Sequence, residues 1–137
     1  MEFIDDNTRK FILGHRNDDV RGLALAADKY SGVDVRMAVD QIQGWQTARR
    51  KLPSWAATDG IVYPPHLNME QCSSETTATY KRMVAAGSGN GPRDILVDLT
   101  GGFGVHFSVL SRAFRKAVYG GRSERLSTTA RHNLRML

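Results

Sequence analysis

The chain has 137 residues, of which 41% are hydrophobic and 24% are charged, and its formal net charge at pH 7 is +5. This is the composition of a folded globular protein, and the length suffices for about one domain of typical size. The first residues lack the basic start and apolar run of a secretory signal, and no stretch approaches the ~18 apolar residues of a membrane helix, so we expect a cytoplasmic location and no membrane partner.

The charge is distributed unevenly along the chain. Residues 1–92 carry eleven Lys/Arg and eleven Asp/Glu, whereas residues 93–137 carry eight Lys/Arg and only three acids. A basic surplus of this kind suits a polyanion such as RNA. The same cations also fit the solvated faces of two amphipathic helices, so charge alone leaves both interpretations open. The cations concerned are Arg112, Arg115, Lys116, Arg122, Arg125, Arg131 and Arg135.

The first fifty residues predict helices that pack into a small bundle. A short helix is predicted with Asp6 or Asn7 as its cap and Gly14 at its end, and a second is predicted to begin at Asn17, because such side chains accept hydrogen bonds from first-turn amides. A third follows and closes before Pro53. Its predicted apolar stripe is Val35, Ala38, Ile42 and Trp45.

Trp45, Trp55 and the cations 49–51 allow two interpretations. Aromatic rings beside cations form surfaces that bind nucleic acid. Alternatively, a Trp at helical spacing belongs to the core, and cations at a helix C-terminus interact favourably with the helix dipole.

Residues 53–68 predict an extended connector, because they break the helical period and contain three of the four prolines. A helix is then predicted with Ser73 or Ser74 as its cap and Glu75 in its first turn, ending near Gly87. The Gly-rich residues 87–92 predict a flexible link to the next segment.

A short apolar run, Ile95–Val97, predicts a strand buried on both faces, and Asp98 follows at its end. The next residues are Thr100, Gly101, Gly102, Phe103 and Gly104, a loop that allows positive φ angles and close approach of a ligand to the backbone. Helical spacing of Phe103, Phe107, Leu110 and Phe114 predicts that this loop opens a helix.

The glycine spacing discriminates between cofactor classes. A dinucleotide fingerprint would place glycine at Phe107, and a P-loop would place lysine after the glycines, so neither pattern fits. The pattern acid-x-x-x-Gly-x-Gly does fit, with Asp98, Gly102 and Gly104 in register, and it is the first motif of class I S-adenosylmethionine (SAM) methyltransferases. An ordinary strand-turn-helix corner is the structural alternative.

The similarity extends beyond this loop to residues 44–49, 52–56, 64–67 and 70–75. Together these segments resemble a bacterial family of class I SAM-dependent methyltransferases that carry a THUMP-like domain after the catalytic one and are distantly similar to RNA cap guanine-N2 methyltransferases. The resemblance implies an α/β fold: an N-terminal helical bundle, followed by the first β-α-β unit of a Rossmann-like SAM methyltransferase domain that is incomplete here. It divides the chain into a helical region (1–52), a connector with a pocket-lining helix (53–92) and the start of the SAM-binding domain (93–137).

The resemblance also implies a site. Its cofactor is SAM, no metal is expected, and no catalytic residue is assigned. The residues implied to bind or flank the cofactor are Asp98, Thr100, Gly101, Gly102, Phe103, Gly104, Gln71, Ser73, Ser74 and Glu75. For the four in the segment 71–75, N-capping of a helix is the alternative role.

The chain departs from the family pattern in three places. His106 stands where the family has an acid after the last glycine, and we interpret it as a helix-surface residue. Gly120 and Gly121 follow the predicted second strand, 117–119, where an acid usually binds the ribose hydroxyls; Glu124 comes three residues late. An Asn/Asp-Pro-Pro-Tyr-like motif, which would position a target base, does not occur in the sequence.

We therefore expect a truncated or degenerate SAM-dependent methyltransferase that acts on RNA, with at most weak cofactor binding. The alternative is a noncatalytic helical module that binds RNA or protein and retains a vestigial cofactor loop; a Rossmann-type nucleotide binder with other chemistry ranks third. Self-association through the incomplete sheet is a further expectation, because a parallel sheet requires cover on both faces.

Overall fold

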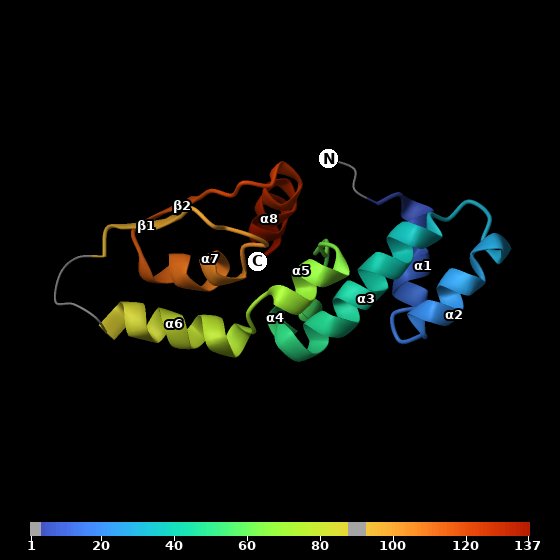
Figure 1. Cartoon of the computed structure of the whole chain (residues 1–137), viewed down its shortest axis with the longest axis horizontal. Helices are drawn as coiled ribbons and strands as arrows, with labels where there is room; N and C mark the ends of the chain where they lie inside the picture. The colour runs from blue at the N-terminus through green and yellow to red at the C-terminus, as the bar shows by residue number, and fades with distance from the viewer. Residues whose placement is uncertain (1–3, 88–92) are drawn as a thin grey trace.

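A computed structural model describes residues 4–87 and 93–137 of the chain, so that all of the predicted flexible link 87–92 except Gly87 lies outside these residues. The molecule is elongated, with a helical bundle at one end and a small parallel sheet with its helices at the other (Figure 1). The bundle consists of α1 (Asp6–Gly14), α2 (Val20–Leu25) and α3 (Val35–Lys51), with α1 and α2 both packed on α3. The predicted bundle is thus present.

The helix caps differ from those predicted. The carboxylate of Asp5, rather than Asp6 or Asn7, accepts the Thr8 N–H at 3.0 Å, and the Thr8 hydroxyl donates to its other oxygen at 2.6 Å. These bonds lower the pKa of Asp5, that from the Thr8 side chain most of all. Asp5 caps α1 because it has the extended backbone that a cap requires.

The second cap is Asp19 rather than Asn17. Asp19 accepts the Gly22 N–H at 2.8 Å, whereas the neighbouring Asp18 is engaged by the imidazole of His15 at 2.6 Å. Helix α2 therefore begins later than the sequence predicts, and it is followed by a 3₁₀ turn at Ala27–Lys29.

The connector is helical at both ends, which corrects the prediction of an extended segment over 53–68. Helix α4 (Pro53–Ala57) begins at Pro53, where the missing N–H of proline is no loss because first-turn amides lack helical partners. Helix α5 (His66–Gln71) follows Pro65. Only the stretch between them, residues 58–65, is nonhelical.

Two side-chain amides hold this stretch between a helix of the bundle and the C-terminal helix. Gln41 of α3 donates to the Tyr63 carbonyl at 2.9 Å and accepts the Tyr63 N–H at 2.8 Å. Asn133 of α8 (Glu124–Met136) donates to the Val62 carbonyl at 2.7 Å and accepts the Val62 N–H at 2.9 Å. We call these the two amide clamps. They pair the backbone as a neighbouring strand would.

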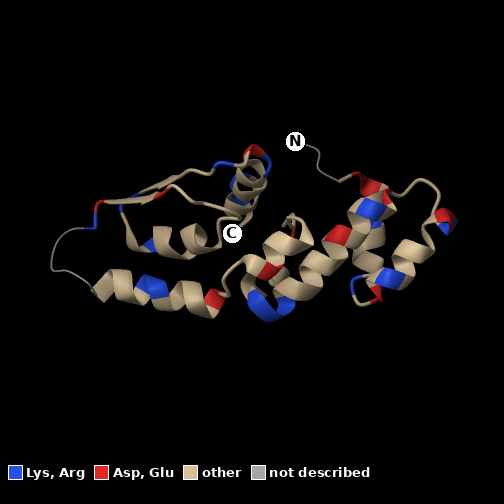
Figure 2. Cartoon of the chain, viewed as in Figure 1, with Lys and Arg blue, Asp and Glu red and all other residues tan. Residues whose placement is uncertain are grey.

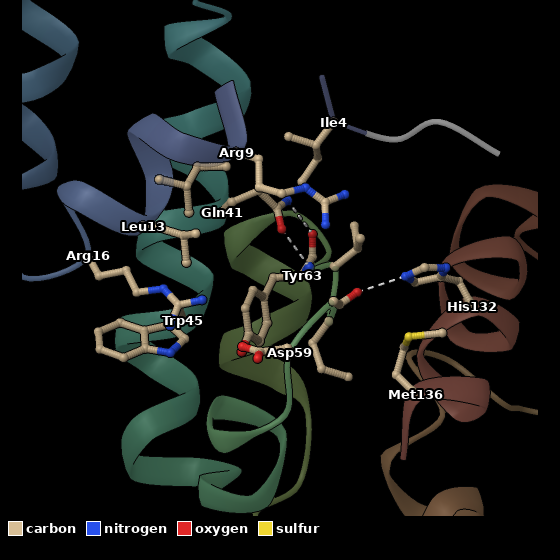
Figure 3. A pocket seen from close by; sticks show the side chains of 14 residues that line it. Ile4, Arg9, Leu13, Arg16, Gln41, Trp45, Asp59, Tyr63, His132 and Met136 are labelled. Carbon is tan, nitrogen blue, oxygen red and sulfur yellow. Dashed lines mark hydrogen bonds between the residues drawn. The ribbon is translucent and has the colours of Figure 1, made fainter. Parts of the chain in front are cut away.

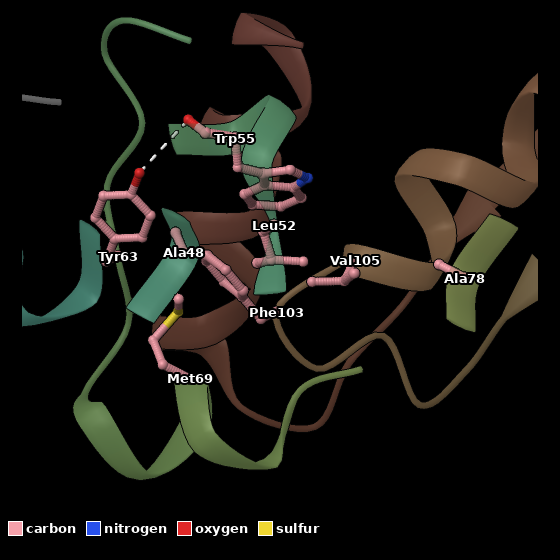
Figure 4. Close-up of a cluster of buried hydrophobic side chains, with 8 residues drawn as sticks. All are labelled: Ala48, Leu52, Trp55, Tyr63, Met69, Ala78, Phe103 and Val105. Atoms are coloured by element: carbon pink, nitrogen blue, oxygen red, sulfur yellow. Dashed lines mark hydrogen bonds between the residues drawn. The ribbon is translucent and has the colours of Figure 1, made fainter. Parts of the chain in front are cut away.

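A core cluster joins the bundle, the connector and the glycine loop (Figure 4). Trp55 and Phe103 pack with ring centroids 4.8 Å apart. Gly44 of α3 allows the connector to approach, because a Cβ there would lie 2.3 Å from the Tyr63 Cβ. The buried members are Ala48, Leu52, Trp55, Tyr63, Met69, Ala78, Phe103 and Val105.

The C-terminal part forms the predicted β-α-β unit. Strands β1 (Ile95–Asp98) and β2 (Lys116–Tyr119) pair in parallel, with Asp98 opposite Tyr119, and α7 (Val105–Leu110) with a following 3₁₀ turn connects them. Helix α6 (Glu75–Gly87) packs against α7. Figure 1 shows both helices on the same side of the sheet.

The prediction that the first strand is buried on both faces is wrong for the described residues. Ile95 is 58% exposed and Val97 53% exposed, as is Val118 beside Val97 in the sheet. Helix α7 covers one face only, so alternate side chains of β1 remain on the outer face. Within residues 4–87 and 93–137, no helix combines the length and the apolar character needed to cross a membrane.

Candidate functional site

The candidate site begins where β1 ends. The Asp98 carboxylate accepts the Thr100 N–H at 3.0 Å and the Thr100 hydroxyl at 3.2 Å, so one carboxylate oxygen orders the first turn of the loop. The carboxyl ends of parallel strands are where ligands bind in open α/β sheets. Asp98 and Thr100 thus lie at the end of β1, and their hydrogen bonds give them a structural role. A role in cofactor binding stays a prediction.

Two loop glycines have the conformation that the predicted cofactor motif requires. Gly102 has φ 48° and Gly104 has φ 87°, and residues with a Cβ rarely adopt either. Gly101 is required for a different reason, because a Cβ there would lie 2.3 Å from a ring carbon of Tyr119. Packing against Tyr119 at the end of β2 thus explains Gly101 without a ligand.

Tyr119 is a site residue that sequence reasoning missed. Its hydroxyl donates to the Gly102 carbonyl at 2.8 Å, and its ring meets Phe107 edge to face at 5.5 Å. The available signal was that the predicted second strand ends at Tyr119; the register found in the sheet then places Tyr119 beside Asp98 at the end of β1. Tyr119 braces the glycine loop.

The predicted residue Phe103 has its side chain in the core. It is 5% exposed and packs on Trp55, so a contact between Phe103 and a cofactor would use its backbone. Trp55 is itself only 1% exposed, which rules out the interpretation that it contributes to an aromatic nucleic-acid surface. Trp45 is half-buried, with the guanidiniums of Arg16 and Arg49 each 5.1 Å from its ring centroid.

The segment 71–75 connects α5 to α6. Ser74 Oγ accepts the Thr77 N–H at 3.2 Å and caps α6, while Glu75 accepts the Ser54 N–H at 2.9 Å and also the Ser54 hydroxyl. Gln71 is exposed and Ser73 is half-buried. The hydrogen bonds of Ser74 and Glu75 thus fix the starts of α6 and α4. A role for this segment in cofactor binding stays a prediction.

His106 is half-buried on the surface of α7 and lies beside Lys81 of α6. Lys81 Nζ lies 3.3 Å from His106 Nε2, so a neutral imidazole can accept a hydrogen bond from the ammonium. Burial, and next the charge of Lys81, lower the pKa of His106, while the nearby Asp98 carboxylate opposes them. Helical spacing places Lys81 on the same face of α6 as the buried Ala78, three residues earlier, but it does not indicate His106 as the partner.

The second strand lacks the ribose-binding acid, as the sequence indicates. Gly120 follows β2 directly, and its N–H donates to the Asp98 carbonyl at 2.7 Å. Glu124 instead lies in a separate hollow with Pro64, Pro65 and residues of α3. Among the residues that the structure describes, no cluster of His, Cys, Asp and Glu could hold a metal ion.

Neither a protein-family model nor a curated protein matches this sequence. Among solved structures, the chain is similar to the crystal structure of a "putative methyltransferase from Porphyromonas gingivalis W83", with a TM-score of 0.74 and 26% sequence identity. The match covers 100% of this chain and 34% of that one, so the chain spans about a third of that protein. The mixed α/β structure of this chain is consistent with part of a methyltransferase-like fold.

Proposed function

We propose that this chain is the front part of a SAM-dependent methyltransferase and that its glycine loop contributes to cofactor binding. The observation that carries the proposal is the sequence of features at the end of β1: Asp98, then Gly102 and Gly104 with positive φ, then α7. The structural similarity over the full length of the chain supports it.

The loop fits the cofactor in part. SAM supplies an activated methyl group on a sulfonium, and the protein must orient it and exclude water. Asp98 offers negative charge beside the loop, and the glycines allow the backbone to approach a ligand. Against this, the Tyr119 ring fills the space beside Gly101, and no acid follows β2 to hold the ribose. We therefore propose weak binding.

RNA is the proposed substrate class. Each of the seven C-terminal cations named above is exposed, and Figure 2 shows basic residues on α8. Arg115 pairs with Asp94 at 3.3 Å, and the ion pairs found among the described residues involve none of the other six. These exposed charges also support the alternative function, a noncatalytic module that binds RNA and keeps the loop only for its fold.

Calorimetric titration with SAM tests the cofactor site. The parent is expected to bind weakly, and Gly102→Val to abolish binding because valine is strained at φ 48°. Restoring the acid at Gly120→Asp should tighten binding about tenfold, the effect of one charge-assisted hydrogen bond. Gly120 is the better position, because a Cβ there would lie 3.6 Å from the Asp98 carbonyl, whereas one on Gly121 would lie 2.8 Å from Ser127 Oγ.

Circular dichroism should show that the parent and both variants are folded. If none of the folded proteins binds SAM, the cofactor proposal fails and the noncatalytic module replaces it. RNA binding is tested separately by titrating a single-stranded oligonucleotide at low and moderate salt. Binding through several phosphates should weaken with salt because counterions are released. An affinity for RNA that does not change with salt would contradict the proposed basic surface.

A further inference from the structure

A hollow of about 500 Å³ lies between α1, α3, the connector and α8, and none of the glycine-loop residues lines it (Figure 3). Its size falls within the range of about 300–1,000 Å³ that is usual for small-molecule sites. Arg16 and Trp45 stand on one side of it, His132 and Met136 on the other, and Tyr63 and Asp59 between them.

The hollow has a surplus of positive charge. Arg9 and Arg16 both line it, against the single lining carboxylate of Asp59. The ion pairs found among the described residues involve neither arginine. A guanidinium is always charged and presents donors in a fork that matches a carboxylate or phosphate. The two arginines therefore favour an anionic ligand.

Arg16 also leaves a donor unused. Its Nε is buried and has no hydrogen-bond partner, while its guanidinium lies 5.1 Å from the centroid of the Trp45 ring. Buried donors are nearly always paired, because an unpaired one costs its full desolvation free energy. The packing against Trp45 holds the guanidinium in place. Because Nε has almost no accessible surface, an acidic group in the hollow would pair with the terminal nitrogens of Arg16.

Much of the remaining lining is apolar, and its connector wall is held by hydrogen bonds. Leu13, Ile61 and Met136 offer an aliphatic surface beside the arginines. The two amide clamps fix the backbone of Val62 and Tyr63, and His132 Nε2 lies 2.8 Å from the Gly60 carbonyl. A wall fixed in this way loses little conformational freedom when a ligand binds.

We propose that this hollow binds a small organic anion, a carboxylate or phosphate monoester with an apolar body. Its acidic group pairs with Arg16 and Arg9, and its body contacts Leu13, Ile61 and Met136. The proposal does not depend on SAM binding, because the two sites share no residue.

Titration of the full chain with phenyl phosphate tests the proposal, with calorimetry and Trp fluorescence as readouts. The expected result is saturable binding that Arg16→Gln weakens at least about tenfold, since a charged pair is lost. Arg9→Gln, at an exposed position that tolerates substitution, should weaken it several-fold. Arg21→Gln, on α2 and outside the hollow, is the matched control and should leave the affinity unchanged.

Benzyl alcohol, which keeps the ring but carries no charge, should bind far more weakly than phenyl phosphate. Benzoate in place of phenyl phosphate distinguishes the two anion types, and binding of either supports the proposal. Three results would overturn it: no saturable binding of either anion at millimolar concentration, equal affinity for benzyl alcohol, or unchanged affinity in both Arg16→Gln and Arg9→Gln. If Arg16→Gln does not fold, Arg9→Gln alone decides.

Discussion

Helix α3 and strand β1 were both predicted from their apolar residues, yet many side chains of α3 are buried and those of β1 are not. Seven residues of α3 are buried, including Ala38, Ile42 and Ala48 at full burial, whereas no residue of β1 is buried. Both segments carry regular apolar residues. The difference arises from their neighbours, because α3 is contacted by α1, α2, α4 and α5, while β1 pairs with β2 alone in the described sheet.

This comparison shows that an apolar pattern predicts which side chains would be stabilised by burial. Whether they are buried depends on the elements that pack against them. The bundle supplies neighbours to α3 from residues within a few tens of positions. The β-α-β unit has α7 on one face and leaves Ile95, Val97 and Val118 exposed on the other. The helical part should therefore be the more stable one.

The largest change in stability is expected at the amide clamp that Gln41 of α3 forms with Tyr63. Gln41→Leu should lower the free energy of unfolding by ~2–4 kcal/mol, because it leaves the buried N–H and carbonyl of Tyr63 unpaired. Gln43→Leu, on the same helix but without a hydrogen bond to Tyr63, is the matched control and should change stability by less than ~0.5 kcal/mol. Urea unfolding measures both. Equal midpoints for the two variants would mean that the clamp contributes nothing.

The second prediction compares backbone protection in the two segments. Amide exchange in β1 should be on the order of a hundredfold faster than at Ile42 and Trp45 of α3, because a two-stranded sheet with an uncovered face opens locally. Hydrogen exchange read by NMR provides the measurement. Equal protection at Leu96 and Ile42 would instead indicate that something covers the sheet, and a concentration-dependent protection would identify a second copy of the chain.

The smallest effect concerns His106 beside Lys81. The pKa of His106 is lowered in the folded chain, so below pH ~6.5 the unfolded chain binds the proton more readily. The neutral imidazole therefore contributes stability above the unfolded-state pKa of ~6.5. This stability is lost as the pH falls from there through the lower pKa of His106 in the folded chain. The difference in urea midpoint between the parent and His106→Gln should shrink from about pH 8 to about pH 5. A constant difference would contradict this.

Much of the fold was predictable because local rules govern it. The helix from Val35, its stop before Pro53, the strand before Asp98 and the β-α-β order all follow from period and end signals. Helix α4 was missed because Pro53 signals both a stop and a start. The caps at Asp5 and Asp19 were missed because neighbouring acids compete, and contacts with Thr8 and His15 decide between them.

The candidate site was predictable only where one segment forms it. The positive φ angles at Gly102 and Gly104 follow from the loop pattern alone. The bond from Tyr119 to Gly102 and the approach of Lys81 to His106 join residues 17 and 25 positions apart, and no local period encodes them. The hollow beside Arg16 is formed by segments from both ends of the chain, so its composition became visible only once α8 was placed.

The two amide clamps also set an order of events during synthesis. Gln41 and Tyr63 are 22 positions apart, so the first clamp can close soon after the connector leaves the ribosome. Asn133 comes 71 positions after Val62, a delay of roughly 4 to 14 seconds at ordinary rates of ~5–20 residues per second. During that interval the N–H and carbonyl of Val62 must form their hydrogen bonds with water. A nascent chain halted before Asn133 would therefore expose one wall of the hollow to chaperones and proteases.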